Sequence, residues 1–173
     1  MKRFSLLLAA VLLFLLCACS SKETDVSAMP EDFSFFLRWN VYGVSSYDSE
    51  SGELIKSDAE PEREKYSATL HLSDEQLRLA WEAVASLDWA DYVTEEGNYD
   101  PNPGLVSEPS LKLELIVEEN GLLHRICCAD AAMTYDSPDE AGQALLTAIR
   151  TLQDLLTETP EWQAMPDFTV LFY

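Results

Sequence analysis

Two stretches of the chain carry a large apolar residue at every second position, and this period constrains the fold more than any other feature. In residues 33–42 these positions hold Phe33, Phe35, Leu37, Trp39 and Val41. In residues 111–118 they hold Leu111, Leu113, Leu115 and Val117. Successive side chains of a β-strand point to opposite faces of its sheet, so each stretch predicts a strand with one apolar face.

A hairpin is predicted directly after the second stretch. Asn120-Gly121 favours a type I′ turn, because both residue types tolerate a positive φ angle. With Glu119 opposite Leu122, the pairs that follow are His124 with Val117, Ile126 with Leu115, and Cys128 with Leu113. This register places Cys128 on the apolar face and Cys127 on the other face, so we expect no disulfide between them.

Two helices are predicted from a start signal followed by an apolar stripe. The sequences Ser73-Asp74-Glu75-Gln76 and Ser137-Pro138-Asp139-Glu140 both fit a capping box, the second with Pro138 at the first helical position. The stripes comprise Leu77, Ala80, Trp81, Val84 and Leu87 in one helix, and Leu145, Ala148, Ile149, Leu152, Leu155 and Leu156 in the other. We expect helices at about 74–86 and 138–158, the second ended by Pro160.

The remaining strand-like segments complete a fold prediction. Residues 65–72 alternate again, residues 47–55 contain a Ser51-Gly52 turn signal for a hairpin extension, and residues 168–172 are typical of a last strand. The predicted order is ββα-ββα-β. Hairpins followed by helices indicate the α+β class, so we expect an antiparallel sheet of about 4–5 strands with both helices packed on one face.

The first twenty residues, MKRFSLLLAAVLLFLLCACS, are organised like a secretory signal peptide. Lys2 and Arg3 precede an apolar stretch at residues 4–16, and Ala18 supplies the small residue before a cleavage point. As a helix, this stretch would span about 20 Å, less than the roughly 30 Å of a bilayer's hydrocarbon core. A plain transmembrane anchor therefore fits less well than a cleaved signal.

The end of this segment, Leu16-Cys17-Ala18-Cys19, resembles the lipobox of bacterial lipoproteins. The resemblance implies cleavage after Ala18 and a diacylglyceryl group on Cys19, which becomes the first mature residue. Leu16 is too bulky to precede the cut, which favours Cys19 over Cys17. An ordinary secretory signal cleaved elsewhere is the alternative.

A domain organisation and a location follow from this resemblance. We expect a signal peptide at 1–18, a lipidated N-terminus and flexible tether at 19–32, and a single globular α+β domain at 33–173. The protein would be lipid-anchored to the cell membrane on its extracytoplasmic face.

Charge limits the partners that the chain can have. The formal net charge is −20, and removal of residues 1–18 takes away Lys2 and Arg3 but no acidic residue, which leaves −22. Such a surface repels phosphate backbones and anionic headgroups. We therefore expect no nucleic acid partner and no direct docking on a membrane. The charge favours cations or basic partners, although solubility outside the cell is the simpler explanation.

The sequence contains no motif of a known catalytic type: no nucleophile elbow, phosphate loop, dinucleotide fingerprint or His-Glu-x-x-His. His71 and His124 are isolated, and Cys127 and Cys128 lack the spacing of metal ligands. The predicted register places His124 at the rim of the core, where a structural role is simpler than that of a general base. We expect no catalytic residue and no cofactor, and the sequence leans against enzymatic activity.

Two features are weak candidates for binding. The segment 95–104, EEGNYDPNPG, offers oxygen ligands of the kind that calcium takes, on Glu95, Glu96, Asp100 and Asn102, although an acidic turn is the simpler explanation. Some of the chain's many aromatic residues could form an exposed patch for a protein, a peptide or a glycan, although core packing is their usual use. These aromatic residues are Phe36, Tyr42, Tyr47, Trp89, Tyr92, Tyr99 and Tyr135.

The region after the lipobox resembles small acidic lipoproteins of Gram-positive bacteria that have no assigned activity. The resemblance rests on VYGVSSYD at 41–48, LSDEQ at 72–76 and TETPEW at 157–162, and it implies no mechanism and no functional residue. The sequence therefore predicts a membrane-anchored binding or interaction domain. The alternatives are a calcium-dependent binding module and a cell-wall or glycan hydrolase that uses acidic residues of segments 57–64 and 88–109.

Overall fold

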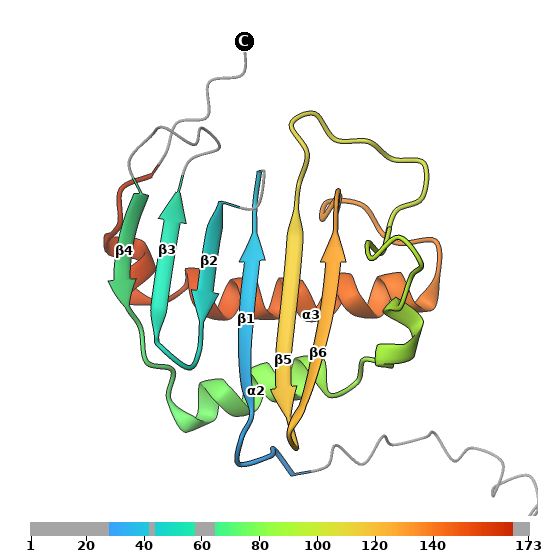
Figure 1. The fold of residues 1–173 in the computed structure, drawn as a ribbon. Helices are drawn as coiled ribbons and strands as arrows, with labels where there is room; N and C mark the ends of the chain where they lie inside the picture. Colours follow the sequence, from blue (N-terminus) through green and yellow to red (C-terminus); the bar gives the residue numbers. More distant parts are fainter. Residues whose placement is uncertain (1–27, 42–43, 58–64, 168–173) are drawn as a thin grey trace, which may run out of the picture.

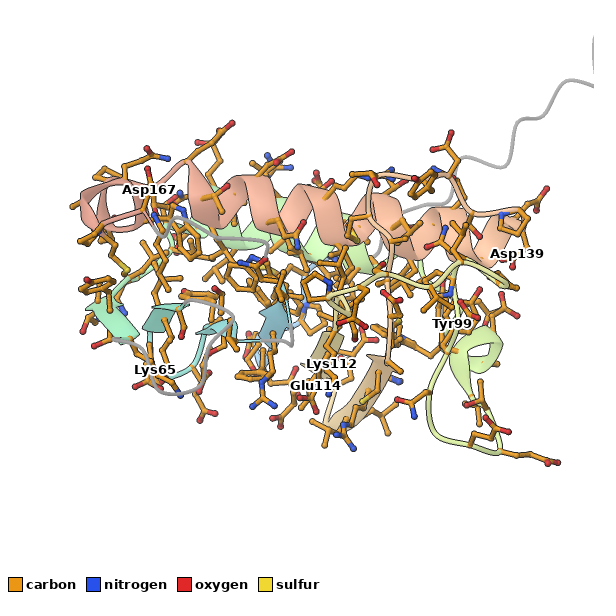
Figure 2. All side chains as sticks on the ribbon, turned by 90° about the horizontal axis from the view of Figure 1, so that it is seen from above. Lys65, Tyr99, Lys112, Glu114, Asp139 and Asp167 are labelled. Atoms are coloured by element: carbon orange, nitrogen blue, oxygen red, sulfur yellow. The ribbon has the colours of Figure 1, made fainter. Side chains whose placement is uncertain are left out.

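The structure is a computed structural model that describes residues 28–41, 44–57 and 65–167. Within these ranges, a six-stranded antiparallel sheet is covered by helices on one face (Figures 1 and 2). The strands are β1 Ser34–Trp39, β2 Ser45–Asp48, β3 Glu53–Ser57, β4 Lys65–Thr69, β5 Leu113–Glu119 and β6 Leu122–Cys128. The helices are α2 Asp74–Val84, α3 Glu140–Thr157 and α4 Pro160–Ala164, with a 3-10 turn, η1, at Trp89–Tyr92.

The predicted α+β class, antiparallel sheet and one-sided helix layer are confirmed. The sheet order is β4-β3-β2-β1-β5-β6, with six strands where about 4–5 were expected. The difference lies in the predicted hairpin extension, because β2 and β3 are both full members of the sheet. The predicted signal peptide, Cys19, most of the tether and the predicted strand at 168–172 lie outside the described residues.

The core lies between the sheet and the two longer helices. Leu37 in β1 pairs with Leu115 in β5 at the centre of the sheet, and both side chains are fully buried. The other apolar positions of these strands are also buried, namely Phe35, Trp39, Leu113 and Val117. The helices bury the predicted stripes against them, through Ala80, Trp81 and Val84 of α2 and Leu145, Ala148, Ile149, Leu152 and Leu156 of α3. The central strands β1 and β5 therefore present a continuous apolar surface to the helices.

The β5–β6 hairpin has the predicted register. His124 pairs with Val117, Ile126 with Leu115 and Cys128 with Leu113. Asn120 and Gly121 take φ angles of 50° and 71°, as a type I′ turn requires. Cys127 and Cys128 are both free thiols, in agreement with their expected positions on opposite faces.

One of the two predicted helix starts is confirmed. Ser73 and Gln76 form the reciprocal capping box at the start of α2. The second box is wrong: α3 begins at Glu140, and its N-cap is Asp139, whose carboxylate accepts a 2.6 Å hydrogen bond from the Gly142 N–H. Asp is as good an N-cap as Ser, so Ser137 and Pro138 remain in the preceding loop.

The start of the domain is fastened to the β5–β6 turn by Asp32. Its two carboxylate oxygens accept hydrogen bonds from the N–H groups of Asn120 and Gly121, at 2.8 and 2.7 Å. The bonds from Gly121 and Asn120 hold the pKa of Asp32 below its ordinary value of 3.8, because they stabilise the charged form. This contact fixes the point where the chain enters the sheet.

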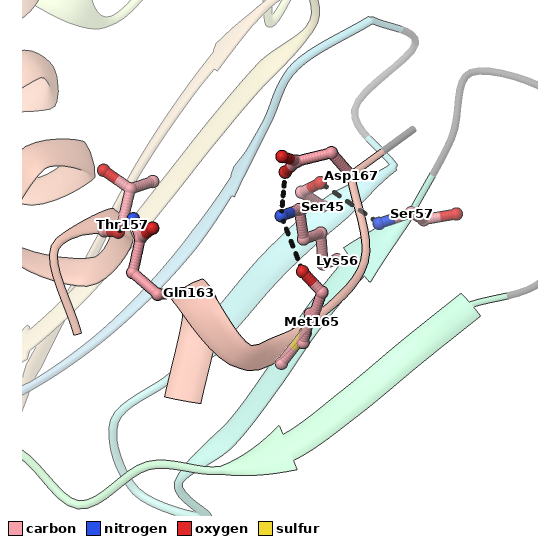
Figure 3. A network of polar contacts seen from close by, with 7 residues as sticks. All are labelled: Ser45, Lys56, Ser57, Thr157, Gln163, Met165 and Asp167. Atoms are coloured by element: carbon pink, nitrogen blue, oxygen red, sulfur yellow. Dashed lines mark hydrogen bonds and ion pairs between the residues drawn. The ribbon is translucent and has the colours of Figure 1, made fainter. Parts of the chain in front are cut away.

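Towards the opposite edge of the sheet, a buried lysine holds the C-terminal segment (Figure 3). Lys56 of β3 is 8% exposed, and its ammonium donates to Asp167 Oδ1 at 2.7 Å and to the Met165 carbonyl at 3.3 Å. The same ammonium lies 5.0 Å from the centre of the Trp162 ring, which stacks on Trp39. The Lys56 ion pair also lowers the pKa of Asp167.

We expect Leu115→Ala to lower the free energy of unfolding by about 2–5 kcal/mol, because it leaves a cavity in the centre of the core. Leu123→Ala is the matched control: Leu123 lies in the same sheet but is 69% exposed, so its truncation should change stability by less than about 0.5 kcal/mol. Urea unfolding measures both. Equal losses for the two variants would contradict the proposed core.

The Asp32 contact predicts a specific titration. Because its folded-state pKa is lowered, the stabilisation is present above pH 3.8 and is lost as the pH falls through the folded-state value. The amide proton shifts of Asn120 and Gly121, followed by NMR, should titrate together with a midpoint below 3.8. In Asp32→Asn this titration should disappear; its persistence would mean that another carboxylate binds the turn.

Candidate functional site

Within the described residues, the helices lie on only one face of the sheet, and Figure 1 looks onto the opposite face. The alternation that buries Leu37 and Leu115 places Arg38, Glu114 and Ile116 on the opposite side. This open face is mixed in character, with Phe36 and Ile116 partly buried at its centre and charged side chains around them. It is the surface of the sheet on which a ligand has direct access.

A cleft of about 390 Å³ lies on the open face where β1 ends and β5 begins. We call it the open-face cleft. Its polar lining residues are Arg38, Asn98, Lys112, Glu114, Arg125 and Cys127, and its less polar lining residues are Leu113, Cys128 and Ala129. Strands β1, β5 and β6 position most of these side chains, so the site stands on the rigid part of the fold.

Glu114 organises the charged groups of the cleft. Its Oε1 accepts hydrogen bonds from Arg125 Nε at 2.9 Å and Arg125 Nη2 at 2.6 Å, while its Oε2 lies 3.3 Å from Arg38 Nη1. The Glu114 side chain is only 15% exposed, whereas those of Arg38 and Arg125 are 50% and 61% exposed. A carboxylate set into the sheet therefore fixes two guanidinium groups that still face solvent.

The cleft carries a net positive charge although the chain as a whole is acidic. Three of the chain's eleven basic residues line it, Arg38, Lys112 and Arg125, against one of its 31 acidic residues. Glu114 raises the pKa of Arg125 further, so that guanidinium stays charged. Among the described residues, Lys112 makes no ion pair, so its ammonium is available to a ligand. The acidic chain thus carries a local positive site.

The two thiols near the cleft are not activated. Burial raises the pKa of Cys128 to about 12, and partial burial also raises the pKa of Cys127. A nucleophilic cysteine needs a lowered pKa and access to solvent. Cys127 therefore lines the cleft as a neutral thiol.

The segment 95–104 folds over the edge of β6 and the N-terminal end of α3. Its Tyr99 N–H donates to the Cys127 carbonyl at 2.7 Å, and the Tyr99 hydroxyl donates to Asp139 at 3.1 Å (Figure 2). Desolvation and the Asp139 contact raise the pKa of Tyr99. These bonds give the segment a structural role, as a cover for the sheet edge.

The predicted cation ligands in this segment do not converge. Glu95, Glu96 and Asp100 are exposed, whereas Asn102 is 2% exposed. Asp100 accepts the Asn102 N–H within the turn, and the Asn102 amide donates to the Asp136 carbonyl. Within the described ranges, no three His, Cys, Asp or Glu side chains are grouped to hold a metal ion.

His124 lies in a closed structural cluster. Its ring stacks on Trp89 at 4.5 Å between centres, and Glu119 Oε1 lies 3.3 Å from His124 Nε2 and 3.1 Å from Trp89 Nε1. This arrangement joins η1 to the β5–β6 hairpin. With one nitrogen against Glu119 and one ring face against Trp89, His124 has the rim position that the register predicted.

The predicted aromatic residues are distributed rather than gathered. Tyr47 and Tyr92 are buried, Trp89 and Tyr99 pack against the core, and Phe36 lies on the open face. Tyr135 is 58% exposed, and Tyr42 lies outside the described residues. They form no single patch within the part of the chain that the structure describes.

A second cavity, of about 340 Å³, lies at the same end of the sheet, bordered by Trp39, Leu111 and Met133 and by Gln153 and Asp154 of α3. It shares Lys112 with the open-face cleft. Its two charged groups, Lys112 and Asp154, have opposite signs, so it shows no comparable selectivity for charge.

Comparison with known proteins gives no matching family model, no matching curated protein and no matching solved structure. Among the described helices, none has both the length and the apolar character needed to cross a bilayer.

We expect alkylation by iodoacetamide at neutral pH to reach Cys127 before Cys128, and both more slowly than a cysteine in a peptide, because both thiol pKa values are raised. The variants Cys127→Ser and Cys128→Ser, analysed by peptide mass spectrometry, separate the two rates. In urea the two rates should become similar. Faster labelling of Cys128 in the folded protein would contradict its burial.

Proposed function

We propose that this chain is a bacterial lipoprotein, anchored through Cys19 on the extracytoplasmic face of the membrane, whose domain binds a ligand on its open sheet face. The observation that carries the binding role is the open-face cleft, where Glu114 fixes two exposed guanidinium groups on a rigid sheet. Preorganised donors lower the entropy that a ligand loses on binding. The anchor rests on the lipobox resemblance of residues 16–19.

The site supports binding better than catalysis. The cleft contains fixed cations and neutral thiols, and His124 is engaged with Glu119 and Trp89 elsewhere. A hydrolase needs a positioned acid and base beside the reacting bond. Among the acidic residues of the segment 88–109, Glu95 and Glu96 are exposed and do not line the cleft, although their loop contributes Asn98 to it. No observation therefore favours that alternative.

Mass spectrometry of the membrane-extracted protein tests the anchor. We expect the N-terminal peptide to begin at Cys19 and to carry a diacylglyceryl group. Cys19→Ser should abolish the lipid and leave the precursor uncleaved, whereas Cys17→Ser, a matched control two residues away, should still be processed. An unmodified terminus at another residue would overturn the lipoprotein assignment.

A further inference from the structure

We propose that the open-face cleft binds a phosphate monoester group, because Arg38, Lys112 and Arg125 all line this one small volume and bring unused donors and a net positive charge to it. This inference deepens the proposed binding function and rests on it, since it names the class of ligand. It does not depend on the lipid anchor.

The donors left over at the cleft are numerous. Arg38 uses Nη1 and Arg125 uses Nε and Nη2 to reach Glu114, which leaves Nη2 and Nε of Arg38 and Nη1 of Arg125 without a hydrogen bond to another described residue. Lys112 adds an ammonium with three donors. A phosphate group offers several strong acceptor oxygens and forms bidentate contacts with guanidinium groups, so it can satisfy donors from three directions.

The charge of the cleft favours a doubly charged anion over a singly charged carboxylate. The three cations and Glu114 together leave a charge of +2 at the cleft. A carboxylate is already present there as Glu114, and a second one would leave a positive charge uncompensated. A phosphate monoester carries about −1.5 to −2 at neutral pH and therefore balances the site.

The acidic surface around the cleft does not cancel this preference. At physiological ionic strength the Debye length is about 8 Å, so exposed acidic residues farther away are largely screened. The less polar wall formed by Leu113, Cys128 and Ala129 lowers the local dielectric on one side of the cleft. The charged groups that line the cleft therefore contribute most to the local potential.

The volume and the remaining lining suit a phosphate with an attached small group. A cleft of about 390 Å³ lies within the usual range for small-molecule sites and exceeds the needs of one phosphate ion. Asn98 and Cys127 border the same space and can contact the rest of the ligand. A free phosphate ion should therefore bind more weakly than a phosphate ester of a small polyol.

Isothermal titration calorimetry on the full chain in a non-ionic detergent tests this inference. The probes are inorganic phosphate, glycerol 3-phosphate, succinate and acetate, each at physiological ionic strength, where the distant acidic residues are screened. We expect saturable binding of glycerol 3-phosphate, weaker binding of inorganic phosphate, and still weaker or no binding of the two carboxylates. No saturable binding of either phosphate compound, or tighter binding of succinate, would overturn the proposal.

Four variants that each remove one positive charge distinguish binding at the cleft from attraction to the overall charge of the protein. Arg38→Gln, Lys112→Gln and Arg125→Gln should each weaken binding of glycerol 3-phosphate by about tenfold or more, because each removes a charge-assisted contact. Arg78→Gln is the matched control, since Arg78 lies on α2 on the far side of the sheet and pairs with Glu82. Equal weakening by Arg78→Gln would overturn the site.

A second measurement uses the chain without substitutions, so its result does not depend on whether the variants fold. In NMR spectra, glycerol 3-phosphate should shift the Nε–H signals of Arg38 and Arg125 and leave that of Arg78 in place; shifts at Arg78 alone would reject the cleft. Absence of phosphate binding by protein lipidated at Cys19 rejects this ligand class and leaves the anchor intact. If membrane-extracted protein carries no lipid at Cys19 but binds glycerol 3-phosphate, this inference is supported and the anchor is rejected.

Discussion

The structure depends on one-sided burial of its sheet. The apolar positions of β1 and β5 meet at the centre, where Leu37 pairs with Leu115, and the helices α2 and α3 cover them. Burial of an apolar side chain contributes about 1.5–3 kcal/mol, so this face supplies most of the driving force for folding. The other face of the sheet does not pack against the helices. It is free to carry charged groups in fixed positions, and the open-face cleft is built there.

The cleft also shows why net charge is an incomplete guide to partners. The overall charge of −20 argues against anionic ligands, and this argument holds for a large polyanion that would meet the whole surface. A small anion in the cleft meets mainly Arg38, Lys112 and Arg125. Glu114 does not merely subtract from their charge, because its contacts hold two of the guanidinium groups at defined positions. The same carboxylate thus reduces the local charge and orders the donors.

Local signals in the sequence predicted the local structure well. The Asn120-Gly121 turn gave the full β5–β6 register, and Ser73 with Gln76 located the start of α2, because these features involve residues close in the chain. The start of α3 was predicted wrongly because Ser137 and Asp139 are both good N-caps, and only packing decides between them. The sequence predicts only a hairpin extension where β2 and β3 form, because strands of four and five residues give a weak alternation pattern.

The candidate site required contacts between distant parts of the chain. Arg38 and Glu114 become neighbours only when β1 pairs with β5, and nothing in the sequence of either strand specifies that partner. The same reason hid the contact between Lys56 and Asp167. Conversely, the segment 95–104 is rich in oxygen ligands but folds against the β6 edge and α3. Its composition predicts a cation site, but within the described residues its side chains do not converge on one point.

The direction of β1 sets the position of the cleft relative to the point where the chain enters the domain. Asp32 is fastened to the β5–β6 turn at one end of the sheet, and Arg38 lies near the opposite end of β1 (Figure 1). Arg38 is the fifth residue of β1, about 13 Å along the strand from Ser34. For a chain anchored at Cys19, the cleft would therefore lie at the end of β1 opposite to the point where the tether enters the domain.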